Sequence, residues 1–283
     1  MKLCSFLMDG AVKTGAKAGD AVIDLTALGF PSDMNEIILG GEDMLKKISV
    51  AVDGFEGTAI AEKDINFQPV TNPKKIVCEG LNFKSHAEET GGTAPDYPIL
   101  FSKFYDALSA HDKETALPAW HERYDYEAEL VIVVGKRAYN LSSQEEAREH
   151  IFGYTCGNDL SARDCQFLSS QWLSGKSFPG FAPVGPYIAT SDEFNPEEPH
   201  GIFCAVNGVT VQNGVTTDMI FSCAETLYTA SKFFPLEAGD IIFTGTPAGV
   251  IQGLEKDKRV WLKPGDVVKV SIDGIGELVT RLV

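Results

Sequence analysis

The segment 124-YDYEAELVIVVGK-136 decides how this chain is interpreted. Its apolar residues run from Leu130 to Val134 without a break, which is typical of a β-strand buried on both faces. Glu127 and Glu129 come just before this run. Because side chains two residues apart in a strand share a face, we expect both carboxylates to point the same way, with their Cα atoms about 6.5–7 Å apart.

Two ionised carboxylates beside a protein core carry a large free-energy cost unless positive charge compensates them. A divalent cation such as Mg²⁺ or Mn²⁺ provides that charge and prefers oxygen ligands, and no nearby Cys/His set suggests zinc in their place. The alternative is that this end of the strand emerges into solvent, where both glutamates are hydrated. The pair by itself leaves both interpretations open.

A third acid, Asp159, follows a strand-like apolar segment in 153-GYTCGNDLSARDCQ-166. If the chain turns helical at this point, Asp159, Arg163 and Gln166 lie on one helical face. Asp159 would then be a third cation ligand, and Arg163 and Gln166 would reach the same pocket. The alternative is an ordinary helix start, with Asp159 or Ser161 as its N-cap.

The rest of the chain predicts a mainly β (α+β) protein. Many short strand candidates are separated by turn residues, and Asn207-Gly208 and Asp273-Gly274 each mark a β-hairpin. Three segments have helical character: residues 35–52, 142–151, which begins with a possible capping box, and 222–233. We expect a small N-terminal domain over residues 1–70 and a larger domain over residues 71–283, joined by the proline-containing stretch 67–75.

Composition restricts the class of protein. The 283 residues carry a net charge of −16, so the surface repels phosphate backbones and we expect no nucleic-acid partner. No window reaches the roughly 18 apolar residues of a membrane helix, and the N-terminus does not resemble a signal peptide. The six cysteines form no CxxC pair, which predicts reduced, mostly buried thiols and a cytoplasmic location.

Several motifs in order resemble the fumarylacetoacetate hydrolase family over roughly residues 74–283. Six ordered motifs are a specific signal, whereas any one of them alone would be weak. They are GLNFKSHAEETGG (80–92), YDYEAELVIVVGK (124–136), GYTCGNDLSARDCQ (153–166), GKSF (175–178), VNG with Gln212 downstream, and GDIIFTGTPAGV (239–250).

The resemblance implies a mixed β-sandwich roll in the catalytic domain, usually in a homodimer, with a small N-terminal domain attached. It implies that Glu127, Glu129 and Asp159 bind Mg²⁺ or Mn²⁺. It also implies an acid–base pair, His86 and Glu89, within a lid that includes Gly91-Gly92.

For the remaining site residues the resemblance implies an active-site lysine, Lys176, and a substrate-binding role for Arg163, Gln166 and Thr246. From the residues alone, Lys176 could equally be a solvated loop lysine, and Thr246 could belong to a structural turn. Arg163, Gln166 and Lys176 would supply the local positive charge and hydrogen bonds that an acidic protein needs to hold an acidic substrate.

The expected substrate is a small 2-oxo acid. Members of the resembled family act on 2-oxo acids through an enolate held by the cation, so we expect hydrolysis of a C–C bond in a β-diketo acid such as an acylpyruvate or fumarylpyruvate. An oxaloacetate-type decarboxylase or a keto–enol isomerase could use the same centre. A binding protein without turnover stays possible, whereas a nucleotide-dependent enzyme is disfavoured because neither GxxxxGK[ST] nor GxGxxG occurs.

One stretch departs from the family pattern. After GKSF the chain reads PGFAPVGP, where many relatives have Asp-Thr before the Phe. Pro179-Gly180 could reshape the loop beside Lys176, which leaves the substrate preference open.

Overall fold

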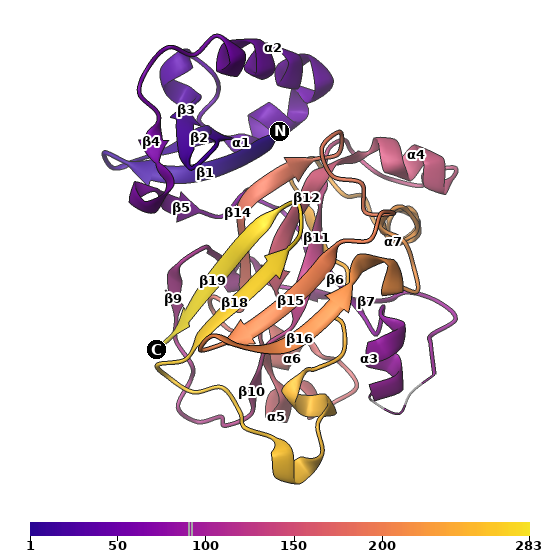
Figure 1. Ribbon diagram of the computed structural model, residues 1–283. Helices are drawn as coiled ribbons and strands as arrows, with labels where there is room; N and C mark the ends of the chain where they lie inside the picture. The colour runs from indigo at the N-terminus through magenta and orange to yellow at the C-terminus, as the bar shows by residue number, and fades with distance from the viewer. Residues whose placement is uncertain (90, 92) are drawn as a thin grey trace.

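The computed structural model describes residues 1–89, 91 and 93–283. It is mainly β, as the sequence predicts, with short helices at the edges (Figure 1). Thr90 and Gly92, which belong to the segment expected to form a lid, lie outside the described residues.

The larger sheet has the strand order β4-β3-β2-β1-β14-β12-β11-β17-β6-β7, with β5 paired to β1 and β8 paired to β14. Its strands are β1 (Lys2–Met8), β2 (Ala11–Ala18), β3 (Ala21–Asp24), β4 (Ile60–Ala61), β5 (Asn66–Gln68), β6 (Ile76–Gly80), β7 (Ile99–Lys103), β8 (Leu108–Ala110), β11 (Ala128–Val134), β12 (Ile151–Asn158), β14 (Ala182–Thr190) and β17 (Ile241–Phe243).

Strand β11 is buried on both faces, which confirms the interpretation of its apolar run. Leu130 and Ile132 belong to the core between the two larger sheets. Val131 and Val133 belong to a second core on the opposite face, together with apolar residues of the N-terminal helices. Because Glu129 and Val131 are two residues apart in the strand, the Glu129 side chain points to the face of this second core.

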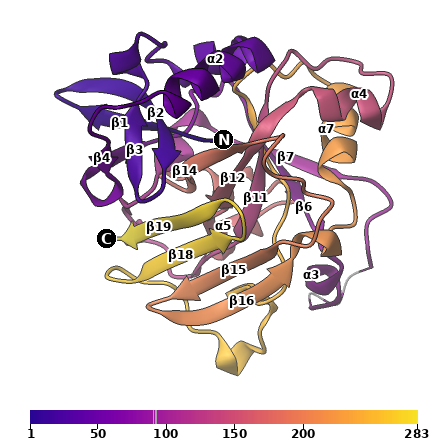
Figure 2. The ribbon, with the colours of Figure 1, turned by 45° about the horizontal axis from the view of Figure 1, so that its top comes forward.

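A five-stranded sheet, ordered β16-β15-β18-β19-β9, covers one face of the larger sheet. Figure 2 shows its hairpins in front of β11, β12 and β14. Both predicted hairpins are present, and the first turns at Asn207 and Gly208 with positive φ angles of 50° and 82°, as a two-residue hairpin loop requires. The strands are β9 (Lys113–Thr115), β15 (Gly201–Val206), β16 (Val209–Val215), β18 (Val267–Ile272) and β19 (Gly276–Leu282), and a separate two-stranded sheet pairs β10 (Tyr124–Asp125) with β13 (Ser161–Ala162).

The N-terminal region extends the larger sheet. Strand β1 pairs with β14 at Lys2 and Leu3, so the sheet passes from the first residues into the rest of the chain without a break. Figure 1 shows this region at one end of the molecule, with α2 on its outer side. The division into domains at residue 70 stays a prediction.

Short helices lie at the edges of the sheets. α-Helices are present in each of the three segments for which the sequence predicts helical character. Ser143 caps α4 by accepting a hydrogen bond from the Glu146 amide at 3.2 Å, which confirms the capping box. The α-helices are α1 (Met34–Leu39), α2 (Gly41–Asp53), α3 (Lys84–Glu89), α4 (Gln144–Glu149), α5 (Arg163–Gln166), α6 (Leu173–Lys176) and α7 (Cys223–Ser231). The 3₁₀ helices are η1 (Thr26–Leu28), η2 (Glu62–Asp64), η3 (Tyr105–Ala107), η4 (Thr216–Asp218), η5 (Ile251–Gly253) and η6 (Lys256–Lys258).

All six cysteines are buried and none forms a disulfide within the described chain, as their spacing predicts. Among the described residues, no helix has the length and apolar character needed to cross a membrane.

Candidate active site

The three predicted acids meet where β11 begins and β12 ends. Carboxylate oxygens of Glu127, Glu129 and Asp159 lie within 4.8 Å of one another, and all three residues are buried. The Asp159 amide donates to the Glu127 carbonyl at 2.9 Å, and the Glu127 amide donates to Asn158 Oδ1 at 3.1 Å. The two segments therefore stay joined beyond the regular ladder, which excludes the solvated strand end that the sequence left open.

The expected helix through Asp159, Arg163 and Gln166 is wrong. Ser161 and Ala162 form β13, which pairs with β10, so α5 begins only at Arg163. Asp159 lies just after β12 and reaches the cluster from the end of a strand. The sheet pairing of residues 161–162 takes precedence over local helical spacing, but Arg163 and Gln166 still line the same cavity.

Three cationic side chains neutralise much of this acidic cluster. Lys176 Nζ lies 2.9 Å from Glu127 Oε2 and 2.5 Å from Asp159 Oδ2. Arg163 Nη2 lies 2.7 Å from Glu127 Oε1. Lys103 forms a further ion pair with Asp159 and donates to the Leu160 carbonyl at 3.1 Å. Lys176 is therefore not a solvated loop lysine.

The sequence interpretation missed Lys103. It ends β7 in the segment ILFSK, and only 3% of its surface is exposed. A lysine at the end of a strand usually extends into solvent, so its position gave no signal.

A fourth carboxylate, Asp125, holds Arg163 in place and was also missed. Its Oδ2 accepts from Arg163 Nε at 2.8 Å, while the Ile251 and Gln252 amides each donate to its carboxylate at 2.9 Å. Arg163 Nη1 donates to Gln166 Oε1 at 2.8 Å. The signal was present in the sequence, because Asp125 stands two residues before Glu127 in a segment already singled out.

Glycine allows the close packing that brings Lys176 to the cluster. A Cβ atom at Gly175 would lie 2.5 Å from the Gln166 amide nitrogen and 2.6 Å from the Ala162 carbonyl oxygen. Helix α6 can therefore pack directly on the backbone of α5 only because residue 175 lacks a side chain. This is the physical reason for the glycine in the motif GKSF.

The pKa values of the two neighbouring glutamates move in opposite directions. Burial alone would raise the pKa of Glu127, but Lys176 and Arg163 lower it well below the usual range. Burial raises the pKa of Glu129, and the negative charges of Asp159 and Glu127 raise it further. Among the three acids, Glu129 is therefore the one whose surroundings favour the protonated form, and added positive charge would oppose this shift.

The segment 244–246 forms another wall of the site. The Gly245 amide donates to Glu129 Oε2 at 2.7 Å, in a conformation with φ of +88° that favours glycine. Thr246 Oγ1 donates to the Ala128 carbonyl at 2.8 Å and lies 2.8 Å from Gln212 Nε2. The Thr246 hydroxyl thus secures the start of β11, and its substrate-binding role stays a prediction.

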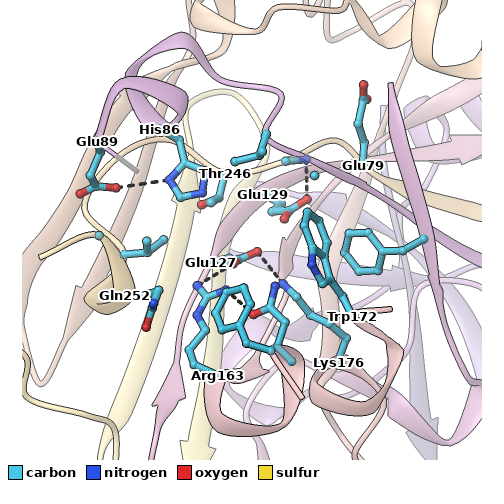
Figure 3. A pocket seen from close by; sticks show the side chains of 18 of the residues that line it. Glu79, His86, Glu89, Glu127, Glu129, Arg163, Trp172, Lys176, Thr246 and Gln252 are labelled. Atoms are coloured by element: carbon cyan, nitrogen blue, oxygen red, sulfur yellow. Dashed lines mark hydrogen bonds and ion pairs between the residues drawn. The ribbon is translucent and has the colours of Figure 1, made fainter. Parts of the chain in front are cut away.

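His86 and Glu89 come from α3, on another side of the cavity. His86 Nδ1 lies 3.2 Å from Glu89 Oε2, as expected for residues three apart on a helix. Glu89 Oε1 accepts from the Gly249 amide at 2.9 Å, which fixes the carboxylate to the GTPAGV segment. Figure 3 shows the pair across the cavity from Lys176 and Trp172, with Glu127 and Glu129 between them.

These side chains surround a cavity of about 490 Å³. Apolar side chains such as Phe101, Phe167, Trp172 and Val250 line it together with the charged residues. The lining residues are Glu79, Gly80, Leu81, His86, Glu89, Phe101, Glu127, Glu129, Arg163, Gln166, Phe167, Trp172, Lys176, Gly245, Thr246, Val250, Gln252, Gly253 and Arg259.

Glu79 is a buried carboxyl residue on β6 that the sequence interpretation missed. Its Oε2 accepts from Thr226 Oγ1 at 2.6 Å and from Asn82 Nδ2 at 3.2 Å, while Oε1 has no hydrogen-bond partner among the described residues. Burial raises the pKa of Glu79 to about 8. Figure 3 shows its carboxyl group pointing away from Glu127 and Glu129, so it does not belong to their cluster.

The donor set fits a hard divalent cation. Asp125, Glu127, Glu129 and Asp159 offer four carboxyl groups to the three cationic side chains Lys103, Arg163 and Lys176, so a fully ionised cluster keeps a surplus of negative charge. Oxygen ligands with surplus negative charge suit Mg²⁺ or Mn²⁺. Glu127, Glu129 and Asp159 are the residues that would hold it.

Comparison with known proteins shows the family of the chain. Residues 75–283 match the family described as Fumarylacetoacetate (FAA) hydrolase C-terminal. A relative from Xenopus laevis, named oxaloacetate tautomerase fahd2, mitochondrial, is 38% identical over 264 residues, which cover 92% of this chain and 82% of the relative.

Two solved structures share the fold over 100% of this chain and 99% of their own. Fumarylacetoacetate hydrolase from the psychrophilic Exiguobacterium antarcticum is 34% identical, with a TM-score of 0.88. Maleylpyruvate hydrolase from Sphingobium sp. SYK-6, solved in complex with manganese (II) ion and pyruvate, is 28% identical, with a TM-score of 0.82. The chain therefore belongs to the fumarylacetoacetate hydrolase family.

Proposed function

We propose that this protein hydrolyses a C–C bond in a β-diketo acid of the acylpyruvate or fumarylpyruvate type, with Mg²⁺ or Mn²⁺ as its cofactor. One observation carries the proposal: the His86–Glu89 pair faces Lys176 across the cavity, with the carboxylates of Glu127 and Glu129 between them. Such a site combines a group that can activate water with groups that bind an anionic oxo acid. The manganese and pyruvate in the Sphingobium enzyme support the choice of cofactor and substrate class.

Glu127, Glu129 and Asp159 would hold the cation, which when bound would act as a Lewis acid on the 2-oxo acid. Arg163 and Gln166 would orient the substrate carboxylate. Asp125 keeps the Arg163 guanidinium in position for this task through its 2.8 Å contact with Nε. Because Arg163 and Gln166 both belong to α5, they would approach the substrate as one preorganised unit.

His86 would take a proton from water as that water attacks the distal carbonyl carbon. Glu89 lies beside Nδ1 and would stabilise the imidazolium that forms. Lys176 would stabilise the negative charge that develops on the carbonyl oxygen, since it carries an ammonium group inside the cavity wall. The acyl fragment would leave as a carboxylic acid, and the 2-oxo acid fragment would take up a proton.

The walls of the cavity favour a substrate with an extended acyl group. Phe101, Phe167, Trp172 and Val250 form an apolar part of the wall beside the charged residues, whereas oxaloacetate is compact and polar throughout. Burial of apolar atoms against such walls stabilises a complex by about 25 cal/mol per Å². An acylpyruvate uses both parts of the cavity.

Oxaloacetate tautomerisation or decarboxylation is the second candidate. The Xenopus relative is named an oxaloacetate tautomerase, and it is 38% identical over 92% of this chain. Both reactions need the cation site and the groups that orient the 2-oxo acid, but neither needs a water molecule to attack carbon.

The test is a substrate panel with acetylpyruvate, fumarylpyruvate and oxaloacetate, assayed in Mg²⁺, in Mn²⁺ and after EDTA. We expect cleavage of an acylpyruvate that EDTA abolishes and added cation restores. Interconversion or decarboxylation of oxaloacetate with no cleavage of either acylpyruvate would replace the proposal by the second candidate. Cation-dependent binding of oxalate without any turnover would indicate a binding protein.

We also propose a homodimer and a cytoplasmic location. The Xenopus relative is named as mitochondrial, so the location of this chain needs its own test. Sedimentation of the purified chain tests the dimer, and fractionation of the source cells tests the location.

A further inference from the structure

A second group of potential metal ligands lies between α5 and the loop before β10, outside the carboxylate cluster. His121 Nδ1 is 3.2 Å from Asp164 Oδ2, and Cys165 Sγ is 3.1 Å from His121 Nε2. One ligand atom from each of these three residues lies within 4.8 Å of the others. The group joins the loop of residues 116–123 to α5, two segments that are more than 40 residues apart in the sequence.

The donor types differ from those of the cation site described above. Imidazole, thiolate and carboxylate are the ligands of zinc and similar thiophilic cations, whereas the Glu127 cluster offers oxygen alone. With zinc–ligand bonds of 2.0–2.3 Å, the ligand atoms of a tetrahedral site lie roughly 3.3–3.6 Å apart. His121 Nδ1 lies 3.2 Å from Asp164 Oδ2 and 3.3 Å from Cys165 Sγ, which is close to those edges, so small side-chain rotations would suffice.

Burial and hydrogen bonding are consistent with a ligand site. Cys165 is 4% exposed, while His121 and Asp164 are only partly buried, so a cation could enter from solvent. Asp164 Oδ1 is buried and has no hydrogen-bond partner among the described residues. The ring of His121 packs beside Phe178, with 5.6 Å between ring centroids, which restricts its orientation.

We propose that His121, Asp164 and Cys165 bind a zinc-class divalent cation through three protein ligands, with water in the fourth position. Binding forms a metal–sulfur bond, and the Cys165 thiol proton is released to solvent. Because Asp164 and Cys165 lie between Arg163 and Gln166 on one short helix, the bound cation would fix α5 to the 116–123 loop. It would therefore act on the position of the groups that orient the substrate, without touching the substrate itself.

The experiment is a titration with Co²⁺ of protein saturated with Mg²⁺, followed by optical absorption. Cobalt bound to a thiolate gives an intense charge-transfer band in the near ultraviolet, and cobalt bound only to the carboxylates of Glu127, Glu129 and Asp159 does not. We expect the band to saturate at one Co²⁺ per chain and to disappear when Zn²⁺ displaces the cobalt. The band reports sulfur ligation and does not depend on enzymatic activity.

Variants locate the site. Cys165→Ser should abolish the band, and His121→Ala should weaken cobalt binding at least about tenfold, since even changes outside the ligand shell cost 10–100-fold. Cys223→Ser removes another buried cysteine and is the control for Cys165→Ser. His200→Ala removes another histidine and is the control for His121→Ala, and both controls should keep the band. Circular dichroism confirms that each variant is folded.

Two outcomes would overturn the proposal. If the folded wild-type protein binds Co²⁺ without a charge-transfer band, then Cys165 is no ligand and the three residues form only a His–Asp ion pair with a thiol packed beside it. If the band persists in folded Cys165→Ser, another cysteine carries the cobalt.

Discussion

The carboxylate cluster and helix α3 supply the two halves of the proposed chemistry, and they are anchored in different ways. The cluster stands where β11 begins and β12 ends, where buried ion pairs with Lys103, Arg163 and Lys176 hold Glu127 and Asp159. Helix α3 has six residues and is fixed by hydrogen bonds to loops, such as that from the Ser85 amide to Asp218 Oδ2 at 3.1 Å.

Because of this difference, we expect substrate binding and water activation to depend on separate parts of the structure. The cluster depends on charge balance in a region of low dielectric, so the loss of one partner affects all the others. The His86–Glu89 pair depends on the Gly249 amide and on the helical spacing of its own residues. Changes in α3 should therefore remove one reaction and leave the binding site intact.

The largest expected effect comes from His86→Ala. Loss of a general base lowers the rate by about 10²–10⁴-fold, so kcat for acylpyruvate cleavage should fall by that amount. The Kd for oxalate in the presence of Mg²⁺ should change little, because the carboxylates and Arg163 are untouched. Steady-state kinetics and calorimetric titration measure the two quantities.

His200→Ala is the matched control, since His200 stacks on Phe194 far from the cavity lining, and it should retain full cleavage activity. Full cleavage by His86→Ala would show that water is activated elsewhere. Equal loss of oxalate binding and cleavage would show that the two regions are not separate.

Lys103→Met tests the charge balance of the carboxylate cluster. Removal of one partner of a buried ion pair costs about 3–5 kcal/mol, because the carboxylates of the cluster then lose one of their three compensating cations. We expect a loss of this size in the free energy of unfolding in EDTA and a clearly smaller loss in excess Mg²⁺, since the cation replaces the missing charge. Urea denaturation under both conditions gives the two values.

Lys46→Met is the control, because Lys46 pairs with Glu42 on the surface of α2 with both side chains largely exposed. It should change stability by less than about 1 kcal/mol under either condition. The same loss for Lys103→Met in EDTA and in Mg²⁺ would contradict the idea that cation and lysine compensate the same carboxylates.

Much of the fold could be predicted from local signals. The unbroken apolar run of β11, the Asn207-Gly208 turn and the capping serine of α4 each depend on residues adjacent in the chain. The contact of β1 with β14 could not be predicted, because it pairs residues almost 190 positions apart and no local pattern encodes it.

The site was predictable to the extent that its residues occur in ordered motifs. Glu127 and Glu129 were identified by their position beside an apolar run, and Asp125 could have been found from its place two residues before Glu127. Lys103 carries no pattern that distinguishes it from a surface charge. The group of His121 and Cys165 was invisible for the same reason, since these residues meet only through the packing of α5 against a distant loop.

The smallest expected effect concerns Glu79, a buried carboxyl near the base of α3 that, unlike Glu127, has no cationic partner in its described hydrogen bonds. Its pKa rises from an ordinary 4.5 to about 8 because of burial. Between pH 4.5 and pH 8 the folded protein therefore keeps a proton that the unfolded chain has already released. This contribution to stability is complete below pH 4.5 and is lost as pH rises through about 8.

Glu79→Gln stays neutral, so between pH 6 and pH 8 the wild type should lose about 2 kcal/mol more of its unfolding free energy than the variant. Glu42→Gln on the surface should follow the wild type, and parallel pH profiles for wild type and Glu79→Gln in urea denaturation would show that Glu79 is already ionised in the folded protein.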